Sequence, residues 1–380
     1  MRRWLPVYRI GPRAQGPSVR AGQECGHASS IDGGVGGSQN GIAFAPAKGV
    51  SLCTSSANVW PGQEGDNVKD FDALLRLVEK HPVRKVAVAV AQDPSVVQAV
   101  HEAKERDVAE AVLVGHEREI AEAAESVGVS LEGMPIVHQE DPIDAVAKAV
   151  QLVSSGEADI LMKGYVHTDD FLRGVLNKEY GLRAGSIMSH VFIAELREKD
   201  KLVFITDGAM NIAPDLEQKA AILLNAVHLA NIFGVMMPKV GVLAAVELVN
   251  PAMPATVDAA ALAKMADRRQ YVPACTVDGP FALDNAVSID AARHKKITGP
   301  VAGEADILLV PCIEAGNMLA KSLVYFASHR LIGLLVGAKA PVVLTSRADS
   351  MESKMLSIAG AVLMVNMKRA LQLKVGKVHY

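Results

Sequence analysis

From about residue 66 onward, short aliphatic runs alternate with longer amphipathic segments, and this alternation restricts the folds open to the chain. The aliphatic runs predict strands at 85–90, 111–114, 135–138 and 160–163. Helices are expected from 94 onward, from 116 to 127 and from 142 to 154, the first and the last with proline at the start. Such alternation builds a mainly parallel sheet with helices on its faces. The sequence therefore predicts the α/β class, with ligands bound beyond the carboxyl ends of the strands.

Composition indicates which side chains form the core and which binding partners are not expected. The 380 residues are 50% hydrophobic but only 4% aromatic, so aliphatic side chains must form the core. A formal net charge of −3 gives no chain-wide attraction to nucleic acid or to an anionic membrane, and no run reaches the roughly 18 apolar residues of a membrane span. The four cysteines lack zinc-site spacing, and their usage fits a reducing cytoplasm. We expect a cytoplasmic protein without a metal site, in which any affinity for anions is local.

Residues 1–65 differ from the rest of the chain. They contain 12 of the 31 glycines and no sustained period of 2 or 3.6 residues. A secretory signal is not predicted, because Pro6, Tyr8 and Arg9 interrupt the apolar stretch that it would need. We expect a disordered N-terminal extension or an upstream-extended reading frame, with an organellar transit peptide as the alternative.

One six-residue sequence occurs twice, as Gly156–Leu161 and as Gly303–Leu308, each time where a helix ends and an apolar strand begins. Polar residues follow both of these strands and also the strand predicted at 202–205. They are Lys163, His167 and Thr168 after the first copy, Glu314, Gly316 and Asn317 after the second, and Asp207 and Asn211 after the third strand. Because functional groups collect at the carboxyl ends of strands, these three turns are candidate substrate-binding segments.

A fourth polar turn follows the apolar run 342–344, which stops at a hydroxyl, a guanidinium and a carboxylate, those of Ser346, Arg347 and Asp349. Asp349 with Glu352 three residues later resembles a capping box, so a helix is expected to begin directly after Asp349. Free N–H groups and the positive end of a helix dipole favour an anion at such a junction. The fork of Arg347 can bind two phosphate oxygens at once, so a phosphoryl group is predicted beside Ser346.

Six stretches together resemble one known family. They are 158–164, 204–215, 250–265, 277–286, 299–316 and 341–350. From about Val86 to Ala361, roughly three quarters of the chain, the sequence resembles the phosphate acetyl/butyryltransferase family. The pair Ala348–Asp349 stands where acetyl-transferring members usually have Gly-Cys, which favours the phosphate butyryltransferase branch.

This resemblance implies a reversible transfer of an acyl group from CoA to inorganic phosphate, with butyryl-CoA as the donor and acetyl-CoA as the alternative. It implies the two-domain fold of isocitrate and isopropylmalate dehydrogenases, with mainly parallel sheets and an inter-domain cleft that holds the active site. The first domain would combine 66–185 with 331–380, and the second would span 186–330. No metal or redox cofactor is implied, and a homodimer or higher homo-oligomer is expected.

The resemblance also implies roles for single residues. Ser346 and Arg347 correspond to the catalytic pair, in which the arginine binds the phosphoryl group and the serine hydrogen-bonds the CoA sulfur or the reacting oxygen. Acetyl-transferring members have an aspartate seven residues after this serine, where Ser353 stands here, so Asp349, Glu352 or no residue would serve as the base. The substrate-binding residues implied are Lys163, His167, Thr168, Arg173, Asp207, Asn211, Glu314, Gly316 and Asn317.

Two alternatives stay open at this point. The second arginine of the family corresponds to Arg173 after His167, but the spacing is one residue shorter than in acetyl-transferring members, so Arg183 is the other candidate. A metal-dependent NAD(P) dehydrogenase would share the fold. It would need a set of aspartates spaced for Mg²⁺ or Mn²⁺ and a G-x-G-x-x-G after a strand, and the sequence offers no convincing example of either.

Overall fold

The computed structural model describes residues 68–370 and 377–379. They belong to one compact unit of the chain, Ser56–Tyr380. The extension expected for residues 1–65 lies outside the described residues, so its disorder stays a prediction.

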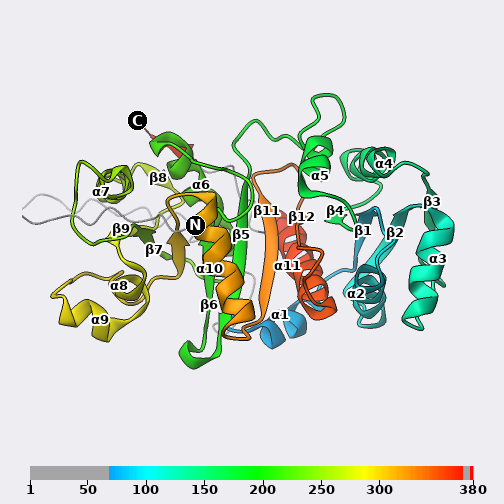
Figure 1. Cartoon of the computed structure of the whole chain (residues 1–380), viewed down its shortest axis with the longest axis horizontal. Helices are drawn as coiled ribbons and strands as arrows, with labels where there is room; N and C mark the ends of the chain where they lie inside the picture. Colours follow the sequence, from blue (N-terminus) through cyan, green and yellow to red (C-terminus); the bar gives the residue numbers. More distant parts are fainter. Residues whose placement is uncertain (1–67, 371–376, 380) are drawn as a thin grey trace, which may run out of the picture. The chain divides into compact units, whose positions relative to one another are not determined.

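The strands of the large sheet are β1 (Arg84–Ala89), β2 (Ala109–Gly115), β3 (Ile136–His138), β4 (Ile160–Lys163), β5 (Ser189–Leu196), β6 (Lys201–Thr206), β7 (Lys239–Leu243), β9 (Thr276–Phe281), β10 (Ile307–Leu309), β11 (Leu331–Val336) and β12 (Val342–Val343). They lie in the order β3-β2-β1-β4-β12-β11-β5-β6-β10-β7-β9 (Figure 1). A second, two-stranded sheet pairs β8 (Tyr271–Val272) with β13 (Lys377–Val378).

The helices are α1 (Phe71–Val78), α2 (Pro94–Glu105), α3 (Glu117–Ser126), α4 (Pro142–Ser154), α5 (Thr168–Val175), α6 (Leu216–Ile232), α7 (Pro254–Asp267), α8 (Leu283–Val287), α9 (Ile289–His294), α10 (Ile313–Tyr325) and α11 (Met351–Ala370). Local sequence explains several of their starts. Asp93 and Asp141 cap α2 and α4, because their side-chain oxygens accept N–H groups of the first turn. Proline then occupies the first helical position, where no N–H is needed.

The large sheet is mainly parallel, as predicted, with two antiparallel strands at its centre. Strands β3, β2, β1, β4 and β12 form one parallel group, and β6, β10, β7 and β9 form another. Between them, β11 and β5 pair antiparallel with each other and with their outer neighbours. The register places Thr206, Val191, Leu334 and Val343 in one row. The carboxyl ends of β6 and β12 therefore lie at the same level of the sheet.

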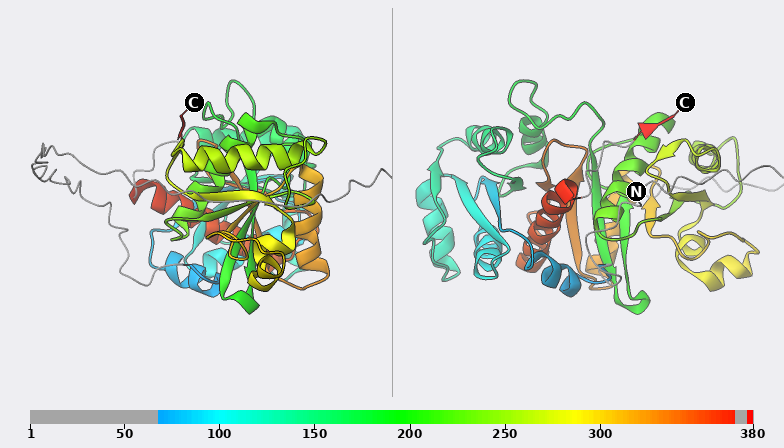
Figure 2. Two further views of the ribbon diagram at one scale, coloured as in Figure 1. Left: turned by 90° about the vertical axis from the view of Figure 1, so that its left-hand side faces the viewer. Right: turned by 180° about the vertical axis from the view of Figure 1, so that it is seen from behind.

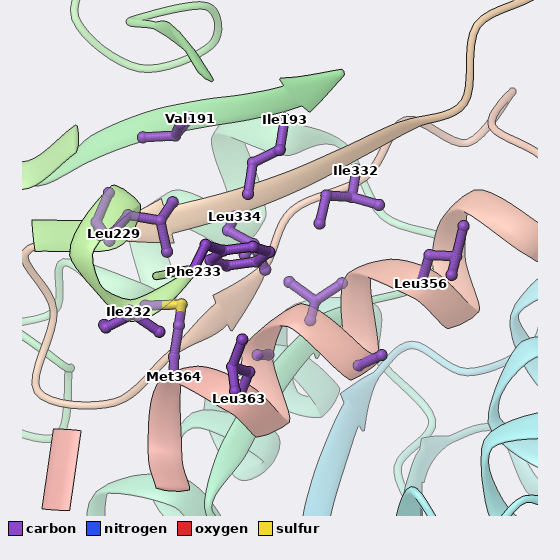
Figure 3. Packing of buried hydrophobic residues seen from close by; sticks show 14 of the residues in the cluster. Val191, Ile193, Leu229, Ile232, Phe233, Ile332, Leu334, Leu356, Leu363 and Met364 are labelled. Carbon is purple, nitrogen blue, oxygen red and sulfur yellow. The ribbon is translucent and has the colours of Figure 1, made fainter. Parts of the chain in front are cut away.

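Alternating side chains of β5 show how helices cover the sheet. Val191 and Ile193 join the core under α6 and α11 (Figure 3), whereas Ala194 packs with Ala320 of α10. Figure 1 shows α10 in front of β5 and β6, and Figure 2, seen from behind, brings α11 to the front of β11 and β12. Helices thus cover both faces, and the carboxyl ends of the strands are left for function.

The predicted division into two domains, 66–185 with 331–380 and 186–330, would separate β11 from β5 within the sheet. These two strands pair along the whole of β11, from Leu331 to Val336. A backbone ladder of this length means that any movement between the two halves must bend or shear the sheet. The division and the cleft stay predictions.

Candidate active site

Three neighbouring parallel strands, β1, β4 and β12, end side by side. Ala89 of β1 pairs with Lys163 of β4, and Met162 pairs with Val343 of β12. Gly164 lets the chain leave β4 close to β1, because a Cβ on this residue would lie 2.2 Å from the carbonyl oxygen of Val90. The residues that leave β12 therefore pass next to Lys163.

The segment after β12 forms a hydrogen-bonded turn, residues 346–349, here called the Ser346 turn. The Ser346 N–H donates to Oδ2 of Asp349 at 2.7 Å, and the Asp349 N–H donates to the Ser346 carbonyl oxygen at 3.2 Å. Both Ser346 and Arg347 are exposed. The guanidinium of Arg347 lies 5.6 Å from the ring centroid of Tyr165, which follows β4. The turn thus presents a hydroxyl and a guanidinium next to the end of β4.

The predicted capping box of Asp349 and Glu352 is wrong, although α11 begins where expected. Ser350 caps the helix, because its Oγ accepts the Ser353 N–H at 3.1 Å. The Asp349 carboxylate instead closes the preceding turn. Glu352 lies 3.4 Å from Arg330, which also binds Glu195 at 2.6 Å. Asp349 is therefore part of the Ser346 turn, whereas Glu352 belongs to an ion-pair network elsewhere.

Three cations, Lys163, Arg347 and Lys354, gather at this place and are here called the cationic cluster. Lys163 is 3% exposed, and its Nζ donates a hydrogen bond of 3.3 Å to the carbonyl oxygen of Gly164. Burial, followed by the positive charges of Arg347 and Lys354, lowers the pKa of Lys163 to about 8. A buried ammonium is unfavourable unless an anion approaches it, so the cluster has the character of an anion-binding site.

Lys354 is the member of the cationic cluster that the sequence did not reveal. It lies in the first turns of α11, is 1% exposed, and its Nζ donates to the carbonyl oxygens of Asp349 and, at 3.4 Å, of Arg347. Burial lowers the pKa of Lys354, while the carboxylates of Asp93 and Asp349 oppose that effect. The 3.6-residue period places Lys354 with Ser350 and Ser357 on one face of α11, and this spacing was the available signal.

The turn after β6, residues 207–211, is here called the Asp207 turn. Asp207 is 2% exposed, and its Oδ1 accepts the N–H groups of Ala209 at 2.9 Å and Met210 at 3.0 Å. Its Oδ2 accepts the side chain of Asn211 at 2.6 Å. Ala209 and Met210 pack against the apolar cluster that includes Leu344, directly before the Ser346 turn. The carboxylate of Asp207 is thus fully engaged in shaping this turn.

Helix α10 packs directly on the Asp207 turn. Asn317 Nδ2 donates to the carbonyl oxygen of Gly208 at 3.1 Å. Gly316 permits this approach, since a Cβ there would lie 2.6 Å from the Asp207 carbonyl oxygen. Glu314 is exposed in the first turn of the helix. The structure therefore brings together Asp207, Asn211, Gly316 and Asn317, which the sequence placed after two different strands.

A histidine that sequence reasoning missed lies between the two turns. His190 of β5 is fully buried, and its Nε2 donates to the carbonyl oxygen of Leu344 at 3.1 Å, while Nδ1 has no hydrogen-bond partner among the described residues. Burial lowers the pKa of His190, against the opposing charges of Asp207 and Asp349. Both carboxylates thus act on one imidazole. Sequence alone gave no signal for this residue, because its partner lies 154 residues away.

The residues predicted on α5 are exposed and lie apart from these contacts. His167 and Thr168 stand at the start of the helix, and the side chain of His167 makes no capping bond. Arg173 is 73% exposed and pairs with Asp170 at 2.7 Å and Asp169 at 3.7 Å. Arg183 is also exposed, and its backbone bridges to Ala338 near the β11–β12 connection. The geometry leaves the choice between Arg173 and Arg183 open.

Two further structural findings concern metal binding and membrane insertion. Among residues 68–370 and 377–379, no group of His, Cys, Asp and Glu side chains has an arrangement that could hold a metal ion. None of the helices in this part of the chain has the length and apolar character that a membrane span requires.

Comparison with known proteins identifies relatives across most of the chain. Residues 71–143 and 138–362 match the family described as Phosphate acetyl/butaryl transferase. A phosphate butyryltransferase of Clostridium beijerinckii is 52% identical over 295 residues, which cover 78% of this chain and 97% of that protein. A phosphate acetyltransferase of Thermotoga maritima is 46% identical over 288 residues, covering 75% and 97%.

A solved structure agrees with these sequence relatives. The branched-chain phosphotransacylase of Enterococcus faecalis V583 superposes with a TM-score of 0.66 at 36% identity. The match covers 74% of this chain and 99% of that protein. The predicted α/β fold with a large, mainly parallel sheet is therefore confirmed by both the strand pairing and the comparison.

Proposed function

The chain belongs to the Phosphate acetyl/butaryl transferase family, and we propose that it transfers a butyryl group between CoA and inorganic phosphate. The higher identity to a phosphate butyryltransferase than to a phosphate acetyltransferase supports butyryl-CoA over acetyl-CoA as the donor. The observation that carries the proposal is the cationic cluster beside the Ser346 turn, since two of its cations are buried and no carboxylate pairs with them among the described contacts. Phosphate is an anion of the size and charge that such a site binds.

In the proposed reaction, a phosphate oxygen forms a bond to the carbonyl carbon of butyryl-CoA. The tetrahedral intermediate then expels the CoA sulfur as the C–S bond breaks, and the thiolate takes up a proton. Arg347 holds phosphate oxygens and offsets the charge on the intermediate, while the hydroxyl of Ser346 hydrogen-bonds the sulfur or the reacting oxygen. The exposure of both side chains is compatible with access by a substrate as large as CoA.

In the reverse direction the CoA thiol must lose its proton before it attacks the acyl phosphate. We assign this role to Asp349. Its Oδ2 accepts the Ser346 N–H, which leaves Oδ1 to accept a proton within the same turn. Glu352 is less suited, because its carboxylate lies against Arg330.

The remaining predicted residues are proposed to bind the substrates from neighbouring turns. They are Lys163 in the cationic cluster, His167, Thr168 and Arg173 on α5, and Asp207, Asn211, Glu314, Gly316 and Asn317 around the Asp207 turn. The support is that β6 and β12 end in the same row of the sheet. Arg183 is the alternative to Arg173 and has the advantage that no carboxylate pairs with it in the described part of the chain.

We also propose a cytoplasmic homodimer or higher homo-oligomer whose two domains close over the substrates. Large exposed apolar side chains at Met318, Tyr325 and Phe326, on and directly after α10, support an association surface. Light scattering of the purified protein would measure the mass directly, and a monomer would contradict this part of the proposal.

The function is tested by mixing the purified protein with butyryl-CoA, inorganic phosphate and a thiol reagent. We expect release of free CoA that requires phosphate, needs no NAD, and continues in EDTA. The same assay with acetyl-CoA and propionyl-CoA ranks the acyl chains. Absence of CoA release from all three donors would reject the proposal, and activity that depends on NAD and a divalent metal would favour the dehydrogenase class.

A further inference from the structure

The side chain of Lys354 contacts the backbone of the Ser346 turn. Its Nζ donates to the carbonyl oxygens of Asp349 and Arg347, the latter at 3.4 Å. These carbonyls belong to the last residue of the turn and to the residue that carries the guanidinium. One buried ammonium therefore ties both to the first turns of α11.

The charges around Lys354 do not balance. Lys163 and Lys354 are 3% and 1% exposed, and Arg347 adds a third positive charge. The carboxylates close enough to affect their pKa values, those of Asp93 and Asp349, are already used elsewhere. Asp93 accepts the Val96 N–H at 3.1 Å as the cap of α2, and Asp349 accepts the Ser346 N–H. Three cations thus lie near two carboxylates that already accept backbone N–H groups. The excess of positive charge favours the binding of a further anion.

We propose that Lys354 is a positioning residue: it fixes the Ser346 turn through the carbonyls of Arg347 and Asp349, and its charge strengthens the binding of phosphate there. The proposal rests on the function proposed above. It explains why a lysine is buried in α11 without a carboxylate bonded to it among the described contacts. It also gives the turn a support on the helix side, while Asp349 supports it from within.

Loss of this lysine should leave the helix in place. Ser357, one turn further along α11, accepts the Gly333 N–H at 3.2 Å and so joins the helix to β11 independently of Lys354. Apolar residues of α11, including Leu356 and Leu363, pack in the core under β5 and β11 (Figure 3). The helix is thus anchored by contacts that the substitution does not touch.

The test compares Lys354→Met, which keeps the length of the side chain, with Lys354→Arg, which keeps the charge. Lys219→Met is the matched control, because Lys219 is 6% exposed and binds Asp258 at 2.6 Å between α6 and α7. We expect Lys354→Met to raise the KM for phosphate by about tenfold to 100-fold, the effect of losing hydrogen bonds from a charged group. The KM for butyryl-CoA should change less than about threefold, and Lys354→Arg should recover most of the phosphate affinity.

A second measurement does not depend on activity. Trypsin cleaves after arginine, and Arg347 is exposed, so the rate of cleavage at this bond reports how often the turn opens. We expect cleavage after Arg347 to be at least about fivefold faster in Lys354→Met than in the unaltered protein or in Lys219→Met.

An unchanged cleavage rate together with an unchanged KM for phosphate in Lys354→Met would overturn the proposal. If this variant does not fold, Lys354→Arg decides, and a KM for phosphate raised more than about tenfold despite the retained charge would contradict the proposal. If the unaltered protein releases no CoA, the proposed function fails, but the cleavage rates still judge whether Lys354 holds the turn.

Discussion

Two copies of the same six residues enter two strands of this protein, and different polar residues follow the two strands. In the copy that enters β4, Oδ2 of Asp159 accepts the Lys85 N–H at 3.1 Å. In the copy that enters β10, Oδ2 of Asp306 accepts the Lys239 N–H at 2.9 Å. Both aspartates thus fasten the start of one parallel strand to the start of its neighbour. The shared sequence thus gives the same hydrogen bond to the neighbouring strand at both places.

The ends of the two strands are chemically unlike. Strand β4 ends at Lys163, a buried cation next to Arg347 and Lys354. Strand β10 leads to α10, where the side chain of Asn317 donates a hydrogen bond to the Gly208 carbonyl oxygen in the Asp207 turn. The cationic cluster has three cations near two carboxylates, those of Asp93 and Asp349, whereas the Asp207 turn satisfies its own carboxylate. The same residues thus begin both strands, whereas the residues that follow the strands differ in charge and in hydrogen bonding.

The largest effect is expected from Arg347→Ala in the cationic cluster. Removing the guanidinium should lower kcat/KM by about 10²- to 10³-fold, the effect of losing one preorganised donor to a transition state, and should raise the KM for phosphate. Because Arg347 is exposed, the free energy of unfolding should change by less than about 0.5 kcal/mol. Arg268→Ala, another exposed arginine, is the control. A near-normal rate for Arg347→Ala would remove the distinction between the two strand ends.

A substitution in the Asp207 turn should lower the stability of the protein. Asp207→Ala leaves the N–H groups of Ala209 and Met210 without their acceptor, and we expect the free energy of unfolding to fall by about 2–3 kcal/mol. Urea denaturation measures this loss, with the exposed Asp290→Ala as the control. Because this turn is also proposed to bind substrate, activity should fall together with stability, and an unchanged stability would contradict the structural role of this carboxylate.

The pH dependence of kcat/KM for phosphate should follow the loss of the positive charge on Lys163. Below about 8 its amine is charged in the folded protein, and above that pH the positive charge is lost. We therefore expect kcat/KM for phosphate to fall as pH rises through about 8, by up to tenfold per unit. Lys163→Arg should move the fall to higher pH. An identical profile in this variant would mean that another group titrates.

The smallest effects are expected from substitutions at the starts of β4 and β10. Asp159→Ala and Asp306→Ala should each lower the free energy of unfolding by about 1–2 kcal/mol, since each removes one acceptor of a backbone N–H. Neither should change kcat for CoA release, because both residues lie at the amino ends of their strands. A loss of activity in only one of them would show that strand entry also shapes the site on that side.

Much of the fold was readable from sequence because local signals agreed with it. Proline after a capping aspartate set the start of α4, and the bounds Pro142–Ser154 and Ile160–Lys163 were predicted to the residue. The family was identified from combined stretches and is confirmed. The antiparallel pair β5 and β11 was not predicted, since its strands are separated by more than one hundred residues and pairing of that range leaves no local mark.

Prediction of the site was less complete for the same reason. Ser346 and Arg347 were predicted as site residues because they follow an apolar run, and their catalytic role stays a prediction. The capping function was assigned to Asp349 when Ser350 performs it, because both residue types favour that position and only geometry separates them. Lys354 and His190 were missed, since burial of a polar residue depends on the elements that pack around it.

The most direct test of the account is a crystal structure of the protein grown with inorganic phosphate. We predict density for a tetrahedral anion within hydrogen-bonding distance of the Arg347 guanidinium and the Ser346 hydroxyl, at the ends of β4 and β12. Phosphate bound only at other places, with Arg347 turned into solvent and the surroundings of Lys163 unchanged, would contradict it.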